Sequence, residues 1–88
     1  MRRSKLEIAL NVLGAISNGT EKPTRIMYSA QLSWNSTQKA LSSLHKQGMI
    51  LELPVENGET KRRKYEITEK GENVLRYFKR SEKLLEIM

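Results

Sequence analysis

The sequence predicts a small α+β domain in which three helices come first, a β-hairpin follows, and a fourth helix comes last. Three observations predict this order. The segment after Ser33 has apolar residues at helical spacing and stops at Gly48. The next segment has the composition of two strands joined at Asn57-Gly58, a dipeptide typical of tight hairpin turns. A chain of 88 residues is long enough for one such domain, spanning residues 1–88, with a modest core.

The first helix is expected to begin after Ser4, which has the spacing of a capping box with Glu7. Its inward face is expected to consist of Leu6, Ala9, Leu10, Leu13 and Ile16. Asn18-Gly19 ends this helix. Gly14 lies inside it, and we expect that position to allow close approach of another element.

Pro23 is expected to open a short second helix, because proline is favoured in the first helical turn. Its inward contacts are expected from Ile26, Met27 and Ala30. Gln31-Leu32 then make a brief turn, and two helices this close in sequence are typical of a helix-turn-helix. The inward face of the third helix is expected to be Trp34, Thr37, Leu41 and Leu44. A basic hairpin follows these helices, so the predicted class is a winged helix-turn-helix.

The two strands of the wing are expected at residues 49–55 and 60–67. Alternation places Arg63, Tyr65 and Ile67 on one face of the second strand and Arg62, Lys64 and Glu66 on the other. Thr68 is the expected cap of the last helix, at residues 69–88, which would be about 30 Å long.

Such a helix is longer than so small a core requires, and its far half has apolar side chains that need a covering surface. We therefore predict a homodimer through this helix. The predicted dimerisation residues are Val74, Phe78, Leu84, Leu85 and Met88. The alternative is a frayed tail.

The net charge of +6 and the placement of the basic residues predict binding to a polyanion. On the outer face of the third helix, Asn35 and Gln38 have amides that can pair with adenine in the major groove, whereas Lys39 and Lys46 suit phosphates. The candidate DNA-binding residues are Arg25, Tyr28, Asn35, Gln38, Lys39, Ser42, Lys46, Lys61, Arg62, Arg63 and Lys64.

Plainer explanations exist for the same features. Any surface helix has a polar outer face, and a charged hairpin discourages edge-to-edge aggregation. Tyr28 suits either a packed aromatic or a hydroxyl donor to phosphate. Trp34 shares the inward spacing of Leu41 but lies at the start of its helix, where residues approach DNA most closely, and core packing is favoured for it. Two other functions stay open. One is a protein-interaction module that uses the third helix and the stripe from Phe78 to Met88, and the other is RNA binding, which the lack of an aromatic stacking platform disfavours.

Catalysis finds little support in the sequence. The chain has one histidine, His45, no Asp and no Cys, and its Glu residues lack the spacing of an acid–base pair or a metal site. We therefore expect neither enzyme activity nor a cofactor or metal. The lack of Cys favours a reducing cytoplasm, and no apolar run approaches the roughly 20 residues that span a bilayer. The expected protein is soluble and cytoplasmic, in association with the nucleoid.

Several short motifs carry a resemblance to a known family. They are Lys22, Thr24-Arg25-Ile26-Met27-Tyr28, Ala30, Leu32-Ser33, Leu41, Leu44, Gly48-Met49-Ile50, Tyr65, Thr68 and Lys70-Gly71. From Ser4 to about Leu75 the chain resembles the archaeal winged-helix predicted transcriptional regulators, a family that includes a ten-kilodalton chromatin-associated DNA-binding protein.

The resemblance implies a winged helix-turn-helix that binds duplex DNA and acts in transcriptional regulation or chromatin organisation. It also implies dimerisation through the C-terminal helix, which forms an antiparallel coiled coil in the chromatin-associated relative. Two departures stand out. The wing, at residues 52–63, is longer and more basic than the family's often short hairpin, and the final helix, ending here at Met88, is shorter than in that relative.

Overall fold

The computed structural model describes the backbone of residues 4–57 and 60–86, and the side chains of residues 4–55 and 63–81. The described part of the chain contains, in order, α1 (Lys5–Ser17), α2 (Pro23–Ala30), α3 (Trp34–Lys46), β1 (Ile50–Asn57), β2 (Thr60–Ile67) and α4 (Glu69–Glu86). The strands form a two-stranded antiparallel ribbon. The predicted fold class and order of elements are confirmed.

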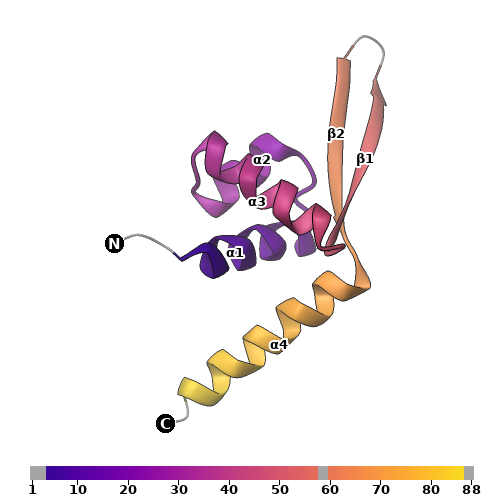
Figure 1. Cartoon of the computed structure of the whole chain (residues 1–88). Helices are drawn as coiled ribbons and strands as arrows, with labels where there is room; N and C mark the ends of the chain where they lie inside the picture. The colour runs from indigo at the N-terminus through magenta and orange to yellow at the C-terminus, as the bar shows by residue number, and fades with distance from the viewer. Residues whose placement is uncertain (1–3, 58–59, 87–88) are drawn as a thin grey trace.

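The elements form a helical body with two projections. In Figure 1, α2 and α3 lie above α1, the β1–β2 ribbon rises beside them, and α4 crosses below α1 before diverging from the body. The extents of 54 × 30 × 20 Å reflect these two projections. The ribbon and α4 therefore extend beyond the helices that build the core.

The core lies where α1, α2 and α3 meet the base of the ribbon and the start of α4. It is built from Val12, Leu13, Ile16, Ile26, Ala30, Leu41, Leu44, Ile50, Tyr65 and Leu75. Of the residues expected on the inward faces, Ala9, Leu10 and Met27 are only partly buried. Two others are exposed, Leu6 at 49% and Trp34 at 48%. Each lies in the first turn of its helix, where the apolar stripe extends past the neighbouring helices. Val12, which the expected pattern omitted, is fully buried.

Local signals at the helix ends are confirmed. The Ser4 hydroxyl oxygen accepts a hydrogen bond from the Glu7 N–H at 3.1 Å, and Ser33 caps α3 through the Ser36 N–H at the same distance. The α2–α3 turn has no glycine, and Gln31 instead adopts a left-handed conformation with φ 55°. For a residue with a Cβ this conformation costs about 1–2 kcal/mol, which the surrounding packing must offset.

The ribbon is slightly longer than expected because its pairing continues from Ile50 opposite Ile67 to Asn57 opposite Thr60. The predicted Asn57-Gly58 turn reaches residues 58–59, which lie outside the described residues. At the ribbon base, the Tyr65 N–H donates to the Glu21 carbonyl oxygen at 2.9 Å. This bond holds β2 against the loop before α2, so the ribbon is positioned relative to the helices.

The junction between the ribbon and α4 is closely packed. Thr68 is the predicted cap, and its hydroxyl accepts from the Gly71 N–H at 3.1 Å while donating to the Gly48 carbonyl oxygen at 2.7 Å. A Cβ at Gly71 would overlap the Met49 carbonyl oxygen and lie 2.8 Å from Cγ1 of Ile67. At Gly14, by contrast, a Cβ would meet no atom within 4 Å, so the expected close approach there is wrong.

None of the helices in the described residues is both long enough and apolar enough to cross a membrane.

Candidate nucleic-acid interface

The outer face of α3 presents the polar side chains that the sequence indicated. They are Asn35, Gln38, Lys39, Ser42 and Lys46, all exposed. The opposite face contributes Thr37, Leu41 and Leu44 to the buried interior, which fixes the rotation of the helix. The Thr37 hydroxyl donates to the Ser33 carbonyl oxygen at 2.9 Å, so this buried polar group is satisfied. Burial on one side therefore directs the amides and lysines outward.

The exposed side chains of α3 border a shallow hollow of about 710 Å³, lined by Gln38, Lys39, Ser42, Ser43, Lys46 and Gln47. Neither α2 nor α3 contains an acidic residue. The lysines at this surface therefore face no opposing charge from their own helix or from α2. A surface of amides, hydroxyls and cations without carboxylates suits an anionic partner.

A second hollow, of about 520 Å³, lies between the helices and the ribbon, and we call it the ribbon-base hollow. It is lined by Lys22, Pro23, Thr24, Arg25, Trp34, Val55 and Arg63. The start of α2, the start of α3 and both strands thus meet at one place. Trp34, expected in the core, is half-exposed here because it is the first residue of α3 and lies beyond the packed part of the helix.

The two hollows lie along the same flank of α3. Gln38 lines the shallow hollow on α3 and Trp34 lines the ribbon-base hollow, and residues four apart on a helix are neighbours on one face. The ribbon therefore stands beside the side of α3 that exposes Gln38. The β2 residue Arg62 pairs with Val55, which itself lines the ribbon-base hollow.

The basic ribbon residues differ in what the structure places beside them. Arg63 forms an ion pair with Glu52 across the ribbon, yet its side chain remains 70% exposed. Lys64 forms an ion pair with Glu66 of the same strand, with Nζ 3.7 Å from Oε1. The backbones of Lys61 and Arg62 belong to β2, and their side chains lie outside the described residues.

Tyr65 anchors the ribbon to the core. It is 5% exposed, and burial raises the pKa of its phenol. The carboxylate of Glu52 raises that pKa further, whereas the Arg63 guanidinium opposes the shift. The phenol is therefore held neutral at the base of the ribbon.

Two candidates on α2 are placed at the surface. Tyr28 is 72% exposed, so the interpretation of it as a packed aromatic is wrong. Arg25 is exposed and lines the ribbon-base hollow. Lys22, which lines the same hollow, was missed as a binding candidate. Its position directly before Pro23, at the start of α2, was the available signal.

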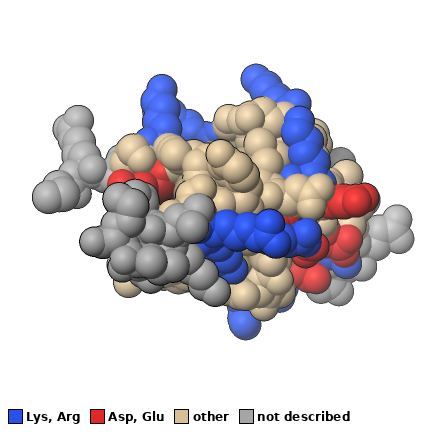
Figure 2. All heavy atoms as spheres, turned by 90° about the horizontal axis from the view of Figure 1, so that it is seen from below, with Lys and Arg blue, Asp and Glu red and all other residues tan. Residues whose placement is uncertain are grey.

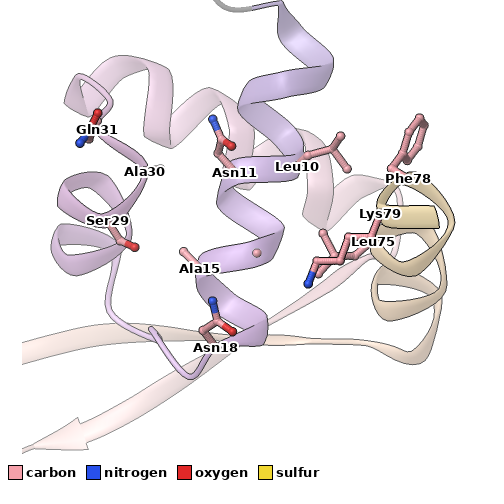
Figure 3. Close-up of a pocket in the computed structure, with 11 residues that line it drawn as sticks. Leu10, Asn11, Ala15, Asn18, Ser29, Ala30, Gln31, Leu75, Phe78 and Lys79 are labelled. Atoms are coloured by element: carbon pink, nitrogen blue, oxygen red, sulfur yellow. The ribbon is translucent and has the colours of Figure 1, made fainter. Parts of the chain in front are cut away.

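The α4 side of the molecule has a different character. Figure 2 views this side and shows basic and acidic side chains interspersed, with apolar and neutral residues between them. A groove of about 480 Å³ separates α4 from α1 and the end of α2. In Figure 3, Leu10 of α1 faces the part of α4 that contributes Leu75 and Phe78.

The predicted dimerisation residues fall partly within the described residues. Val74 packs against the chain's own core, and Phe78 is half-buried at the groove. The Phe78 ring meets Tyr77 edge-on, with centroids 5.3 Å apart, and Tyr77 is 66% exposed. The side chains of Leu84 and Leu85 and all of Met88 lie outside the described residues.

The structure offers little for metal chemistry in the residues it describes. Among them, no three His or Glu side chains are grouped so that they could hold a metal ion. His45 is exposed in the last turn of α3, as expected.

Comparison with known proteins agrees with this geometry. A family model described as winged helix-turn-helix matches residues 2–86. The chain belongs to the winged helix-turn-helix family. An uncharacterised protein of Methanocaldococcus jannaschii is 32% identical over 73 residues, which cover 83% of this chain and 67% of that protein.

Two solved structures have a fold similar to that of this winged-helix chain. One is Sso10a-2, a DNA-binding protein from Sulfolobus solfataricus, with a TM-score of 0.76 and 30% identity over 96% of this chain and 83% of that one. The other is a PadR family transcription regulator from Clostridium difficile R20291, with a TM-score of 0.80 and 14% identity over 90% of each chain. The predicted archaeal resemblance is confirmed, and the second likeness is one of fold.

Proposed function

We propose that this chain binds double-stranded DNA, with α3 in the major groove and the β1–β2 ribbon on the adjacent backbone or minor groove. One observation carries the proposal: the amide-bearing flank of α3 and the base of a cationic ribbon adjoin across the ribbon-base hollow. The similarity to a DNA-binding protein of Sulfolobus solfataricus supports the same partner.

The side chains divide into two roles. Asn35 and Gln38 would read base edges, because an amide can donate to and accept from adenine at once. Contacts to phosphate fix position and add affinity without reading sequence. The residues proposed for that role are Arg25, Tyr28, Lys39, Ser42, Lys46, Lys61, Arg62, Arg63 and Lys64.

A phosphate-based interface predicts a strong dependence on salt. If about six phosphates are contacted, a plot of the logarithm of the association constant against the logarithm of salt concentration should have a slope of about −5. A complex whose affinity ignores salt would contradict this mode of binding.

Charge reversal tests the location of the interface. Replacing Arg62 and Arg63 together by Glu should abolish measurable duplex binding in a fluorescence-anisotropy titration, because two phosphate contacts become repulsive. The matched control replaces Lys79 and Arg80 by Glu, which changes the net charge equally on the exposed surface of α4.

The control should bind duplex nearly as well as wild type. Equal losses in the two variants would mean that only net charge matters, and the proposed interface would be wrong. Full duplex binding by the ribbon variant would remove the ribbon from the interface. A protein partner whose binding survives this charge reversal would favour the protein-interaction alternative, and stronger binding to single-stranded RNA than to duplex DNA would favour the RNA alternative.

We further propose that two copies pair through α4. This helix has 18 residues and diverges from the body beyond α1 (Figure 1). Its Tyr77 side chain is largely exposed. An uncovered amphipathic helix is most simply buried against its symmetry mate. In sedimentation equilibrium we expect about twice the chain mass of 10.2 kDa for wild type and one chain mass for a Leu84→Glu, Leu85→Glu variant. A wild-type monomer at high concentration would refute the pairing.

The biological role we propose is transcriptional regulation or organisation of the nucleoid. Genome-wide occupancy separates the two, because sharp binding at a few sites indicates a regulator and broad coverage indicates an architectural protein.

A further inference from the structure

The ribbon-base hollow contains an apolar feature that a purely electrostatic DNA surface does not need. Trp34 leaves 48% of its surface exposed there, although its position in the sequence predicted burial. Large exposed apolar side chains are informative because burying them is favourable and water contact is not. The solvent-exposed indole between the ribbon and two helices therefore needs an explanation.

The surroundings of the indole define what it can bind. Lys22, Arg25 and Arg63 line the same hollow, and no acidic residue in the described part of the chain belongs to that lining. Glu52 is nearby in its ion pair with Arg63, but the Arg63 side chain as a whole stays largely exposed. The hollow thus combines several cations with one broad apolar face.

This combination matches the chemistry of a nucleic-acid backbone. Each backbone unit has an anionic phosphate and a deoxyribose whose C–H faces are apolar, so cations and an aromatic face side by side suit one such unit. We propose that the ribbon-base hollow seats one phosphodeoxyribose segment of the duplex, with the Trp34 indole packed on the sugar and the surrounding cations on the phosphate. This inference rests on the proposed DNA-binding function and makes Trp34 a binding residue.

The location of Trp34 gives this contact a positioning role. Because Trp34 and Gln38 are one turn apart on the same flank of α3, a sugar held at the indole fixes how deeply the amide enters the groove. Sugar and phosphate contacts do not read sequence, so the effect should be the same on every duplex. Because the indole is uncharged, its contact with the sugar should not contribute to the salt dependence of duplex binding.

The unmodified chain supplies its own reporter, because Trp34 is the only tryptophan. Saturating duplex DNA should shift its fluorescence to shorter wavelength and protect it from acrylamide quenching. Inorganic polyphosphate, which has no sugar, should leave the indole accessible to the quencher. Stronger protection by the single strand than by the duplex would show base stacking instead, and would overturn the proposal.

A substitution measures the contribution. Trp34→Ala should weaken duplex binding about tenfold, or about 1.4 kcal/mol, because the apolar contact with the sugar is lost, while the salt slope stays unchanged. The control is Leu6→Ala, which removes an equally exposed apolar side chain from α1 and should bind as wild type. Circular dichroism checks that both variants fold.

The outcomes separate this inference from the proposed function. Suppose that wild type binds duplex, but Trp34 stays as accessible to acrylamide as in the free chain and Trp34→Ala binds normally. The proposed contact between Trp34 and a sugar is then wrong, and DNA binding stands. If wild type does not bind duplex, the proposed function itself fails.

Discussion

Placing a methyl group at Gly71 should destabilise the fold by an amount that the structure specifies. Gly71 is in the first turn of α4, and a Cβ there would overlap the Met49 carbonyl oxygen and press on Ile67. To relieve the overlap, α4 must move away from the end of α3. That movement stretches the Thr68 hydroxyl bond to the Gly48 carbonyl oxygen, now 2.7 Å long.

The magnitude follows from three contributions. Overpacking typically costs about 1–3 kcal/mol, and the weakened hydrogen bond adds about 1 kcal/mol. The higher helix propensity of alanine returns about 1 kcal/mol. Gly71→Ala should therefore lose about 1–3 kcal/mol of unfolding free energy, which for a domain of this size lowers Tm by roughly 5–20 °C.

Thermal unfolding followed by circular dichroism, at one protein concentration, is the assay. The control is the same substitution at Gly14, where a Cβ meets no atom within 4 Å. Gly14→Ala should raise Tm by a few degrees, because alanine is favoured over glycine inside a helix by about 0.5–1 kcal/mol. A Gly71→Ala variant as stable as wild type would refute the close approach between α4 and residue 49.

Three further predictions concern other parts of the molecule. Gln38→Ala should relax base preference at one position in duplexes selected from a random pool, by about 1–3 kcal/mol, without changing the salt slope; unchanged preferences would remove Gln38 from the base-reading role. Because the pKa of Tyr65 is raised in the folded state, its phenol ionises at lower pH in the unfolded chain. The unfolding free energy measured in urea should therefore fall above about pH 10, and Tyr65→Phe should lack this part of the decrease. Identical pH profiles for the two proteins would contradict this prediction. Thr68→Ala should lose about 1 kcal/mol in the same urea assay whereas Thr68→Ser should not, and equal stabilities would show that the cap contributes nothing.

The features that could be predicted from sequence are those that depend on near neighbours in the chain. The caps at Ser4, Ser33 and Thr68 each involve a residue three positions away, so their signals are local. The rotation of α3 was also predictable, because Thr37, Leu41 and Leu44 recur at helical spacing and are buried. The outward direction of the α3 candidates followed from that rotation.

The errors arose where distant segments decide the environment. Trp34 shares the apolar stripe of α3, but periodicity does not say where the neighbouring helices end. Gly14 and Gly71 are both glycines in helices. They differ because the Met49 backbone, more than twenty positions from Gly71 in the chain, lies directly against Gly71. The ribbon-base hollow likewise joins four elements, so the position of Lys22 directly before Pro23 was by itself too weak a signal to mark it as a binding residue.

The most direct test of the account is to map duplex binding on the chain residue by residue. In NMR titrations of the isotope-labelled protein with duplex DNA, the amide shifts should change along the outer face of α3, at the start of α2 and along β2, including Arg25, Gln38 and Arg63. Changes confined to α4 and the groove beside α1, with α3 and the ribbon silent, would contradict the claim that α3 and the ribbon form one nucleic-acid surface.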